Sequence, residues 1–371
     1  MTNILNILLL LGMIAAVVFF FYSLFKRKLR ILPRILRLLL AAFLFFVASL
    51  LLLMPKGGSL PVTGTDQVLK VDAFYNYPDR DDPYAKDDST NEVPVTFWYP
   101  DDVSSQAALP LVVFSHGASG ISSSNESLYR ELASHGYVVC SISHPNQSLY
   151  TKLSNGKSIY VSPVFMEEMM SDRPDKRPEE SVVHFEKWLG VRMRDMNFVL
   201  DTILKKAADN DQELAVYQLI DPQRIGLMGH SLGGSTVLGI ARQRSDIKAV
   251  MALESPYLFD ITGVNPDGKF TFDESPYEIP MLNVYSDATW SRLSETDLYA
   301  ENARMLKEES ADIQNVHIAG AGHLALTDLA LASPFLGMML DGMIYRQSPK
   351  EILTEVNEVS LRFFCEHLSK N

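Results

Sequence analysis

The chain has 371 residues and a formal net charge of −12, which leaves room for one large α/β domain with additional segments. The acidic balance argues against a nucleic-acid partner. The two cysteines, Cys140 and Cys365, are too few for a disulfide framework, and the sequence has neither an H-E-x-x-H motif nor a Cys/His cluster at zinc spacing. We therefore expect a protein that needs no metal and no cofactor.

Two apolar runs open the chain, at residues 4–25 and 36–54, and each is long enough to span a bilayer. Between them, residues 26–37 are rich in Lys and Arg and contain no Asp or Glu. Basic loops stay in the cytoplasm, so the segment after the second run is expected on the outside. A cleaved signal peptide is the alternative, but the basic n-region is missing and a second run follows, which favours a two-helix membrane anchor.

The domain organisation follows from this pattern. Residues 1–57 are predicted to form the anchor, and residues 66–371 the catalytic domain, with a Gly/Pro/Ser/Thr-rich linker between them. Strand and helix patterns alternate through the second segment, which predicts a mostly parallel sheet with helices on both faces. The expected strands are residues 68–74, 95–99, 111–114, 137–143, a strand ending in 225–228, 247–253, 281–285 and 316–319; the expected helices are 128–134, 191–207, 235–244 and 349–368. Residues 149–189 are a long polar and aromatic insertion between these elements.

A G-x-S-x-G motif lies at the centre of this pattern, as Gly229-His230-Ser231-Leu232-Gly233. An apolar strand precedes it and a helical pattern follows, which is the context of a nucleophile elbow. The turn is narrow, so glycines two positions before and after the serine avoid Cβ clashes. Ser231 is the predicted nucleophile, and the N–H of Leu232 at the start of the helix is a predicted oxyanion donor.

The serine needs a base and an acid that orients the base. His323 follows a strand and a Gly-rich turn, which places it at the carboxyl end of the last core strand, whereas His317 lies inside that strand. We therefore predict His323 as the base. Glu254 and Asp287 each end a core strand, and the usual position of the acid in α/β hydrolases slightly favours Asp287 on spacing alone.

The second oxyanion donor is expected on the loop after the strand at 111–114. His116-Gly117-Ala118 is a short form of the histidine-glycine loop of esterases, and the N–H of Ala118 is the best candidate there.

These motifs resemble the platelet-activating factor acetylhydrolase family, within the dienelactone-hydrolase-like α/β hydrolases. The resemblance implies that the acid lies on the strand after the elbow, in an Ala-Leu-Asp sequence. Ala252-Leu253-Glu254 matches this place, with Glu instead of Asp. On the resemblance we therefore prefer Glu254 as the acid and keep Asp287 as the alternative. The resemblance also implies a calcium-independent serine esterase that removes short or oxidised acyl chains from phospholipids. The stretches that carry it are Val113-Phe-Ser-His-Gly117, Glu131-Leu-Ala-Ser-His-Gly-Tyr137, Gly229-His-Ser-Leu-Gly-Gly234, and His323 with Asp328.

The combined prediction is a membrane-anchored serine ester hydrolase with its catalytic domain outside the cytoplasmic membrane and a small-molecule or lipid ester as substrate. A polyester or dienelactone-type hydrolase and a peptidase of the same fold are close alternatives. A non-catalytic binding protein of this fold is another, although such a protein would be expected to lack the serine or the histidine. A membrane assembly protein is a third class, and the lack of acids and histidines in the apolar runs argues against transport.

Overall fold

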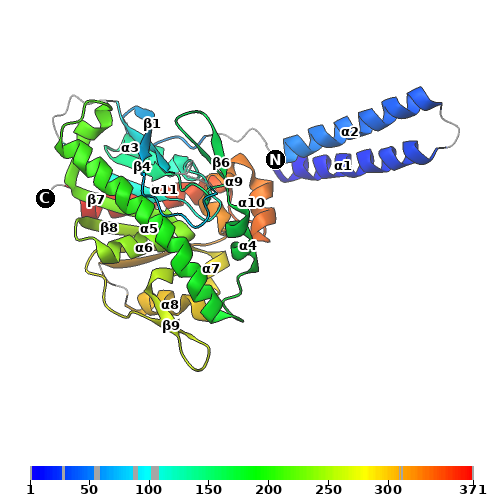
Figure 1. Ribbon diagram of the computed structural model, residues 1–371. Helices are drawn as coiled ribbons and strands as arrows, with labels where there is room; N and C mark the ends of the chain where they lie inside the picture. The colour runs from blue at the N-terminus through cyan, green and yellow to red at the C-terminus, as the bar shows by residue number, and fades with distance from the viewer. Residues whose placement is uncertain are drawn as a thin grey trace.

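A computed structural model describes residues 2–26, 30–53, 59–86, 91–101, 108–308, 310 and 312–369. Two long helices, α1 (Thr2–Phe25) and α2 (Ile31–Leu53), lie side by side as a hairpin that projects from the rest of the molecule (Figure 1). Both are long and apolar enough to cross a membrane, by length and composition. Few of their side chains are buried, and Ser49 on α2 contacts the Met13 sulfur on α1.

The second helix begins five residues earlier than the apolar run predicts, so Arg34 and Arg37 lie on α2 and not in the connecting loop. Proline is favoured in the first turn of a helix, where Pro33 lies, and arginine is a good helix former, so neither residue delays the start. Residues 27–29 and Met54 fall outside the described residues.

The eight-stranded sheet has the order β1-β2-β4-β3-β7-β8-β11-β12, and the six strands from β4 to β12 pair in parallel. β1 and β2 are antiparallel to their neighbours at one edge. This arrangement confirms the predicted α/β-hydrolase type of fold. The strands are β1 (Val68–Asn76), β2 (Glu92–Pro100), β3 (Leu109–Ser115), β4 (Val138–Ile142), β7 (Ile220–His230), β8 (Ile247–Leu253), β11 (Met281–Ser286) and β12 (Ile313–Ile318).

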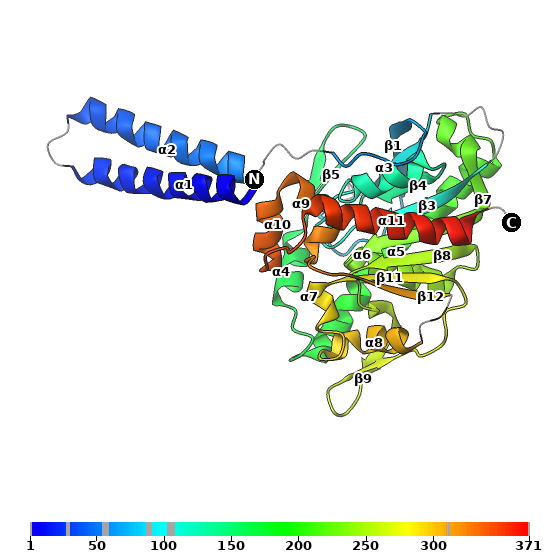
Figure 2. The same cartoon turned by 180° about the vertical axis from the view of Figure 1, so that it is seen from behind.

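Helices cover both faces of the sheet. α5 (Pro178–Ala208) and α6 (Leu232–Gln243) pack on the face nearer the viewer in Figure 1, and α3 (Glu126–Ser134) and α11 (Pro349–Leu368) pack on the face nearer the viewer in Figure 2. β3 is buried on both sides, because Leu111 and Val113 face the α5 side while Val112 and Phe114 face the α11 side. Such double burial is typical of parallel sheets and explains the nearly continuous apolar strands.

α5 begins at Pro178, thirteen residues before the predicted start of this helix. Proline in the first turn, followed by Glu179 and Glu180, is a favourable helix start. The predicted insertion at 149–189 therefore contains the hairpin β5–β6, the helix α4 and the first turns of α5. The remaining elements are β5 (Tyr150–Lys152), β6 (Ser158–Tyr160), α4 (Pro163–Ser171), β9 (Ile261–Val264), β10 (Phe270–Phe272), α7 (Asp287–Trp290), α8 (Ala300–Lys307), α9 (Leu329–Ala332) and α10 (Pro334–Asp341).

Candidate active site

Ser231 lies in the sharp turn between β7 and α6, with the strained backbone angles φ 55° and ψ −126°. Its N–H donates to the Leu253 carbonyl at 2.8 Å, which ties the turn to the neighbouring strand β8. A Cβ on Gly229 would lie 2.4 Å from the Gly233 carbonyl, and one on Gly233 would lie 2.0 Å from the Ser115 oxygen. Both glycines of the motif are therefore required by backbone contacts, as expected for a nucleophile elbow.

The loop after β3 lies directly against this turn. A Cβ on Gly117 would be 3.3 Å from the Ser231 Cβ, so the His116-Gly117-Ala118 segment borders the serine. The N–H of Leu232 is the first of α6 and has no partner within the helix. In the part of the chain that the structure describes, the N–H of Ala118 has no hydrogen-bond acceptor either. The N–H of Leu232, in the turn, and the N–H of Ala118, in the loop beside it, are therefore the candidate donors of an oxyanion hole.

Glu254 and His323 are brought together at the carboxyl ends of the strands. The His323 Nδ1 lies 3.4 Å from the Glu254 Oε2, and the His323 side chain is 35% exposed. Glu254 is fully buried, and its carboxylate also accepts the Ser286 N–H and the Thr289 hydroxyl. Burial alone would raise the pKa of Glu254, but the contact with His323 and the two other hydrogen bonds hold this pKa below its usual value.

Asp287, the alternative acid, is engaged elsewhere. Its carboxylate lies 2.8 Å from the His317 Nε2 and accepts the Gly320 N–H at 3.0 Å. Trp290 stacks on the His317 ring at 4.5 Å between centroids, which fixes this second pair. The structure therefore brings Glu254 to His323 and Asp287 to His317.

His230, inside the elbow, lies against His323. The two ring centroids are 4.6 Å apart, and the His230 Nε2 donates to the His323 carbonyl at 3.0 Å. Burial, and then the neighbouring His323, lower the pKa of His230 to about 3. His230 is therefore a neutral side chain that packs against the histidine loop.

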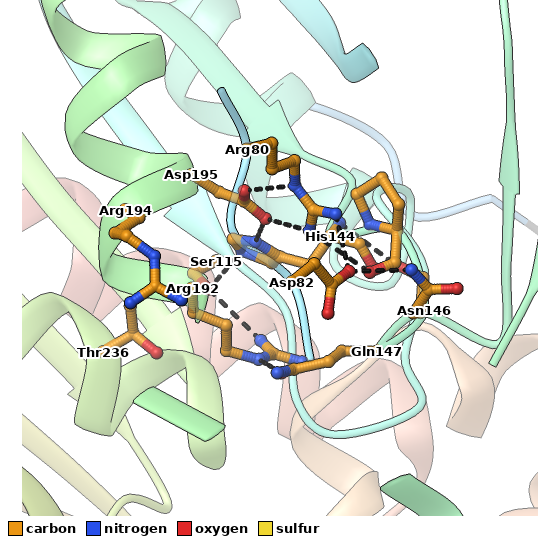
Figure 3. Close-up of polar contacts among 12 residues, drawn as sticks. Arg80, Asp82, Ser115, His144, Asn146, Gln147, Arg192, Arg194, Asp195 and Thr236 are labelled. Carbon is orange, nitrogen blue, oxygen red and sulfur yellow. Dashed lines mark hydrogen bonds and ion pairs between the residues drawn. The ribbon is translucent and has the colours of Figure 1, made fainter. Parts of the chain in front are cut away.

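A buried polar network lies beneath the loop that follows β3 (Figure 3). It was not identified from the sequence. Ser115 lies 3.0 Å from the His144 Nε2, and the His144 Nδ1 lies 3.1 Å from Asp195. These three side chains have the connectivity of a hydrolytic triad but are fully buried, so no substrate reaches them. Arg80 pairs with Asp195 at 2.7 Å, and Arg192 reaches the same region from α5. The spacing of Arg192 and Asp195, three residues apart on one helix, does not reveal this network, because Asp195 pairs with Arg80 from another segment.

The described residues contain no group of three or more His, Cys, Asp or Glu side chains placed to hold a metal ion. The chemistry of the site described above is that of a hydroxyl, an imidazole, a carboxylate and backbone N–H groups.

Comparison with solved structures supports the fold. A ferulic acid esterase from Streptomyces cinnamoneus superposes with a TM-score of 0.60 over 84% of this chain and 93% of that chain, at 20% sequence identity.

Among curated proteins, the platelet-activating factor acetylhydrolase of Gallus gallus is 26% identical over 282 residues, which are 70% of this chain and 62% of the relative. Cutinase 2 of Thermobifida cellulosilytica is 30% identical over 158 residues, 43% of each protein. The chain thus spans less than two thirds of the length of these relatives.

The family model described as platelet-activating factor acetylhydrolase, isoform II, matches residues 93–371, which include all but the first residue of β2, every later strand of the sheet and every candidate site residue. The motifs around Ser231 and His323, the parallel sheet and this match agree, and the chain belongs to the platelet-activating factor acetylhydrolase, isoform II family.

Proposed function

We propose that the protein is a serine carboxylic-ester hydrolase that acts through Ser231, His323 and Glu254. The observation that carries this proposal is the contact between the His323 Nδ1 and the Glu254 carboxylate, at the same sheet edge as the strained Ser231 turn. A carboxylate in this place keeps the proton on Nδ1, which leaves Nε2 free to act as base.

The reaction proceeds in two halves. The Ser231 Oγ attacks the acyl carbon while the His323 Nε2 takes the hydroxyl proton, and the N–H groups of Leu232 and Ala118 stabilise the oxyanion. When the C–O bond to the alcohol breaks, His323 protonates the leaving oxygen. Water, deprotonated by His323, then attacks the acyl-serine ester and releases the acid and free Ser231.

A fluorophosphonate probe tests this mechanism, because it labels only a serine that is activated as a nucleophile. Wild-type protein should be labelled and should hydrolyse p-nitrophenyl acetate, whereas Ser231→Ala and His323→Ala should each lose several orders of magnitude of activity without unfolding. The combined variant should be no worse than either single variant, because the residues act as a unit. A folded Ser231→Ala protein with near-normal turnover refutes the mechanism.

Short acyl chains on lipid-like esters are the substrate class that we favour. The family membership supports the acyl preference, and the helix pair α1–α2 would hold the domain near a bilayer. Exposed apolar side chains on α4 and α10, on the side of the domain from which the helix pair projects, also suit a lipid surface (Figures 1 and 2); they are Val164, Met170, Met339 and Leu340. Initial rates on acetyl, butyryl and palmitoyl esters of one head group should fall with chain length, and faster release of palmitate would contradict this preference.

The cutinase relatives support a second candidate, a polyester hydrolase. Release of soluble acids from an insoluble polyester film, compared with the rate on a short-chain phospholipid, separates the two. A film rate that exceeds the phospholipid rate favours the polyester substrate.

We further propose that α1 and α2 anchor the protein with the catalytic domain outside the cytoplasmic membrane. The basic residues between and at the start of these helices support this orientation. Protease added to intact spheroplasts should digest the catalytic domain. Protection until lysis would mean the opposite orientation, and a mature protein that lacks residues 1–25 would mean a cleaved signal.

A further inference from the structure

Arg192 lies fully buried in the middle of α5, and Figure 3 shows its guanidinium beside Ser115 and Gln147. The guanidinium also donates to two backbone carbonyls of the loop that follows β3. Nη1 donates to the His116 carbonyl, and Nη2 donates to the Gly117 carbonyl at 3.2 Å. Nε donates to the Gln147 side-chain oxygen at 2.6 Å, which fixes the plane of the guanidinium. Such a rigid fork of donors sets geometry in a way that a lysine ammonium does not.

The Gly117 carbonyl receives three donors. Besides Arg192, the Gly120 N–H donates to it at 3.0 Å and the His116 Nδ1 donates at 2.7 Å. The carbonyl of residue 117 and the N–H of residue 118 belong to one planar trans peptide, so they point in opposite directions. Fixing the Gly117 oxygen toward Arg192 therefore also fixes the direction of the Ala118 N–H. The same segment borders the nucleophile turn, because a Cβ on Gly117 would lie 3.3 Å from the Ser231 Cβ.

Charge adds to this geometric effect. No carboxylate contacts the Arg192 guanidinium among the described residues, because Asp195 is engaged by Arg80 and His144. Burial lowers the pKa of Arg192 to about 9, so the side chain is cationic at neutral pH. A cation that polarises the Gly117 carbonyl makes the N–H of the same peptide a stronger donor, since hydrogen bonds in series reinforce each other at low dielectric.

We propose that Arg192 is a positioning residue of the oxyanion hole: it holds the peptide between Gly117 and Ala118 so that the Ala118 N–H meets the oxyanion formed at Ser231. This inference rests on the proposed ester hydrolysis and adds to it a residue from α5, far from the elbow in sequence. The buried Ser115, His144 and Asp195 side chains then have a supporting role, since Ser115 also contacts Arg192 at 3.4 Å.

The test compares the catalytic efficiency with the affinity for an alkyl trifluoromethyl ketone. Ser231 Oγ adds to the ketone carbon, its proton passes to His323, and the carbonyl oxygen becomes an oxyanion in the hole. For a residue that acts on the oxyanion, kcat/KM for p-nitrophenyl butyrate and the ketone Ki change by the same factor, while KM changes little. A variant that only loosens packing lowers the fraction of sites titrated by a fluorophosphonate but leaves the ketone Ki of the remaining sites unchanged.

Arg192→Met should lower kcat/KM and weaken ketone binding together by about 10²-fold, the scale of losing one oxyanion donor. Arg192→Lys should lose about tenfold, because one ammonium cannot hold both carbonyls in plane. Arg242→Met is the control, because Arg242 lies at the opposite end of α6 from Ser231. Like Arg192 it binds two loop carbonyls, those of Ser275 and Pro276, and unlike Arg192 it also pairs with the Asp260 carboxylate. The control should keep wild-type values for both quantities.

If neither Arg192 variant folds, Gln147→Leu tests the inference, because it removes the acceptor of the Arg192 Nε–H and leaves Arg192 in place. We expect it to lower kcat/KM and to weaken ketone binding by the same factor. A folded Arg192→Lys or Gln147→Leu protein with an unchanged ketone Ki overturns the inference. A wild-type protein that neither binds the ketone nor reacts with the fluorophosphonate overturns the proposed ester hydrolysis instead. Failure of the inference on Arg192 and failure of the proposed function are therefore distinguishable.

Discussion

Replacing Glu254 by Gln isolates the role of the acid from its packing. The amide has nearly the shape of the carboxylate, and its oxygen can still accept the Ser286 N–H. Its NH₂ group is then directed at Thr289 and His323, and only a donor is left to face the His323 Nδ1. His323 is forced to carry its proton on Nε2, the nitrogen that must accept the Ser231 proton.

The size of the loss follows from this tautomer change. In a serine protease the equivalent substitution costs about 10⁴ in turnover. The Nδ1–Oε2 distance of 3.4 Å in the unliganded site is longer than an ideal hydrogen bond, and such contacts tighten when substrate binds. We therefore expect Glu254→Gln to lower kcat by about 10³- to 10⁴-fold, with KM nearly unchanged.

Asp287→Asn is the matched control, since it makes the same chemical change one strand away. Asp287 contacts His317 and the Gly320 N–H, so its amide should affect His323 only through the loop, by tenfold or less. Both variants are assayed on p-nitrophenyl acetate after thermal unfolding confirms that they fold. An inactive Asp287→Asn beside an active Glu254→Gln would refute the assignment of the acid.

Three further outcomes follow from the structure. EDTA should leave the activity unchanged, because no metal-binding cluster occurs within the described ranges; restoration by added metal after a loss would contradict this. Gly233→Ala should lose activity and stability, because its Cβ would meet the Ser115 oxygen at 2.0 Å, while Gly190→Ala, which meets only the flexible Arg194 side chain, should be tolerated; thermal unfolding and activity separate them. Burial raises the pKa of Asp328 to about 6, so this group stabilises the native protein most below about pH 4, and that contribution is lost as the pH rises through 6 and the carboxyl ionises. Relative to Asp328→Asn, the wild type should lose up to about 3 kcal/mol in free energy of unfolding over that range. If the free energies of unfolding of the two proteins change in parallel from pH 4 to 8, this prediction is wrong.

The parts of the fold that could be predicted are those with a strong period or strong local chemistry. The buried parallel strands are apolar on both faces, and most of their predicted bounds are within two or three residues of the observed ones. The starts of two helices were predicted less accurately. α5 begins thirteen residues and α6, at Leu232, three residues before the predicted start. Gly233 and Gly234 hide the start of α6, because glycine has low helix propensity, whereas the close packing of the elbow requires it there.

The sequence predicts the candidate nucleophile and base of the site but leaves the choice of the acid ambiguous. Ser231 and His323 follow from motif and order along the chain. Both Glu254 and Asp287 end core strands, and nothing in their local sequence tells which one faces His323. The two acids differ in their surroundings, since one is fully buried against Thr289 and the other is partly exposed beside His317, and only the folded chain determines those neighbours.

The proposed nucleophile and the proposed acid both have a strained backbone. Ser231 and Glu254 have φ angles of 55° and 53°, in the left-handed region that disfavours residues with a Cβ, and they follow the adjacent strands β7 and β8 directly. Such angles cost of order 1 kcal/mol or more each and persist only where the surroundings fix them. Here the Ser231 N–H is held by the Leu253 carbonyl and the Glu254 N–H by the Val284 carbonyl, so each turn is anchored to the next strand. Glycine would relieve the strain at both positions but has neither a hydroxyl nor a carboxylate. The proposed mechanism requires both groups, and it therefore accounts for two residues that backbone stability alone would disfavour.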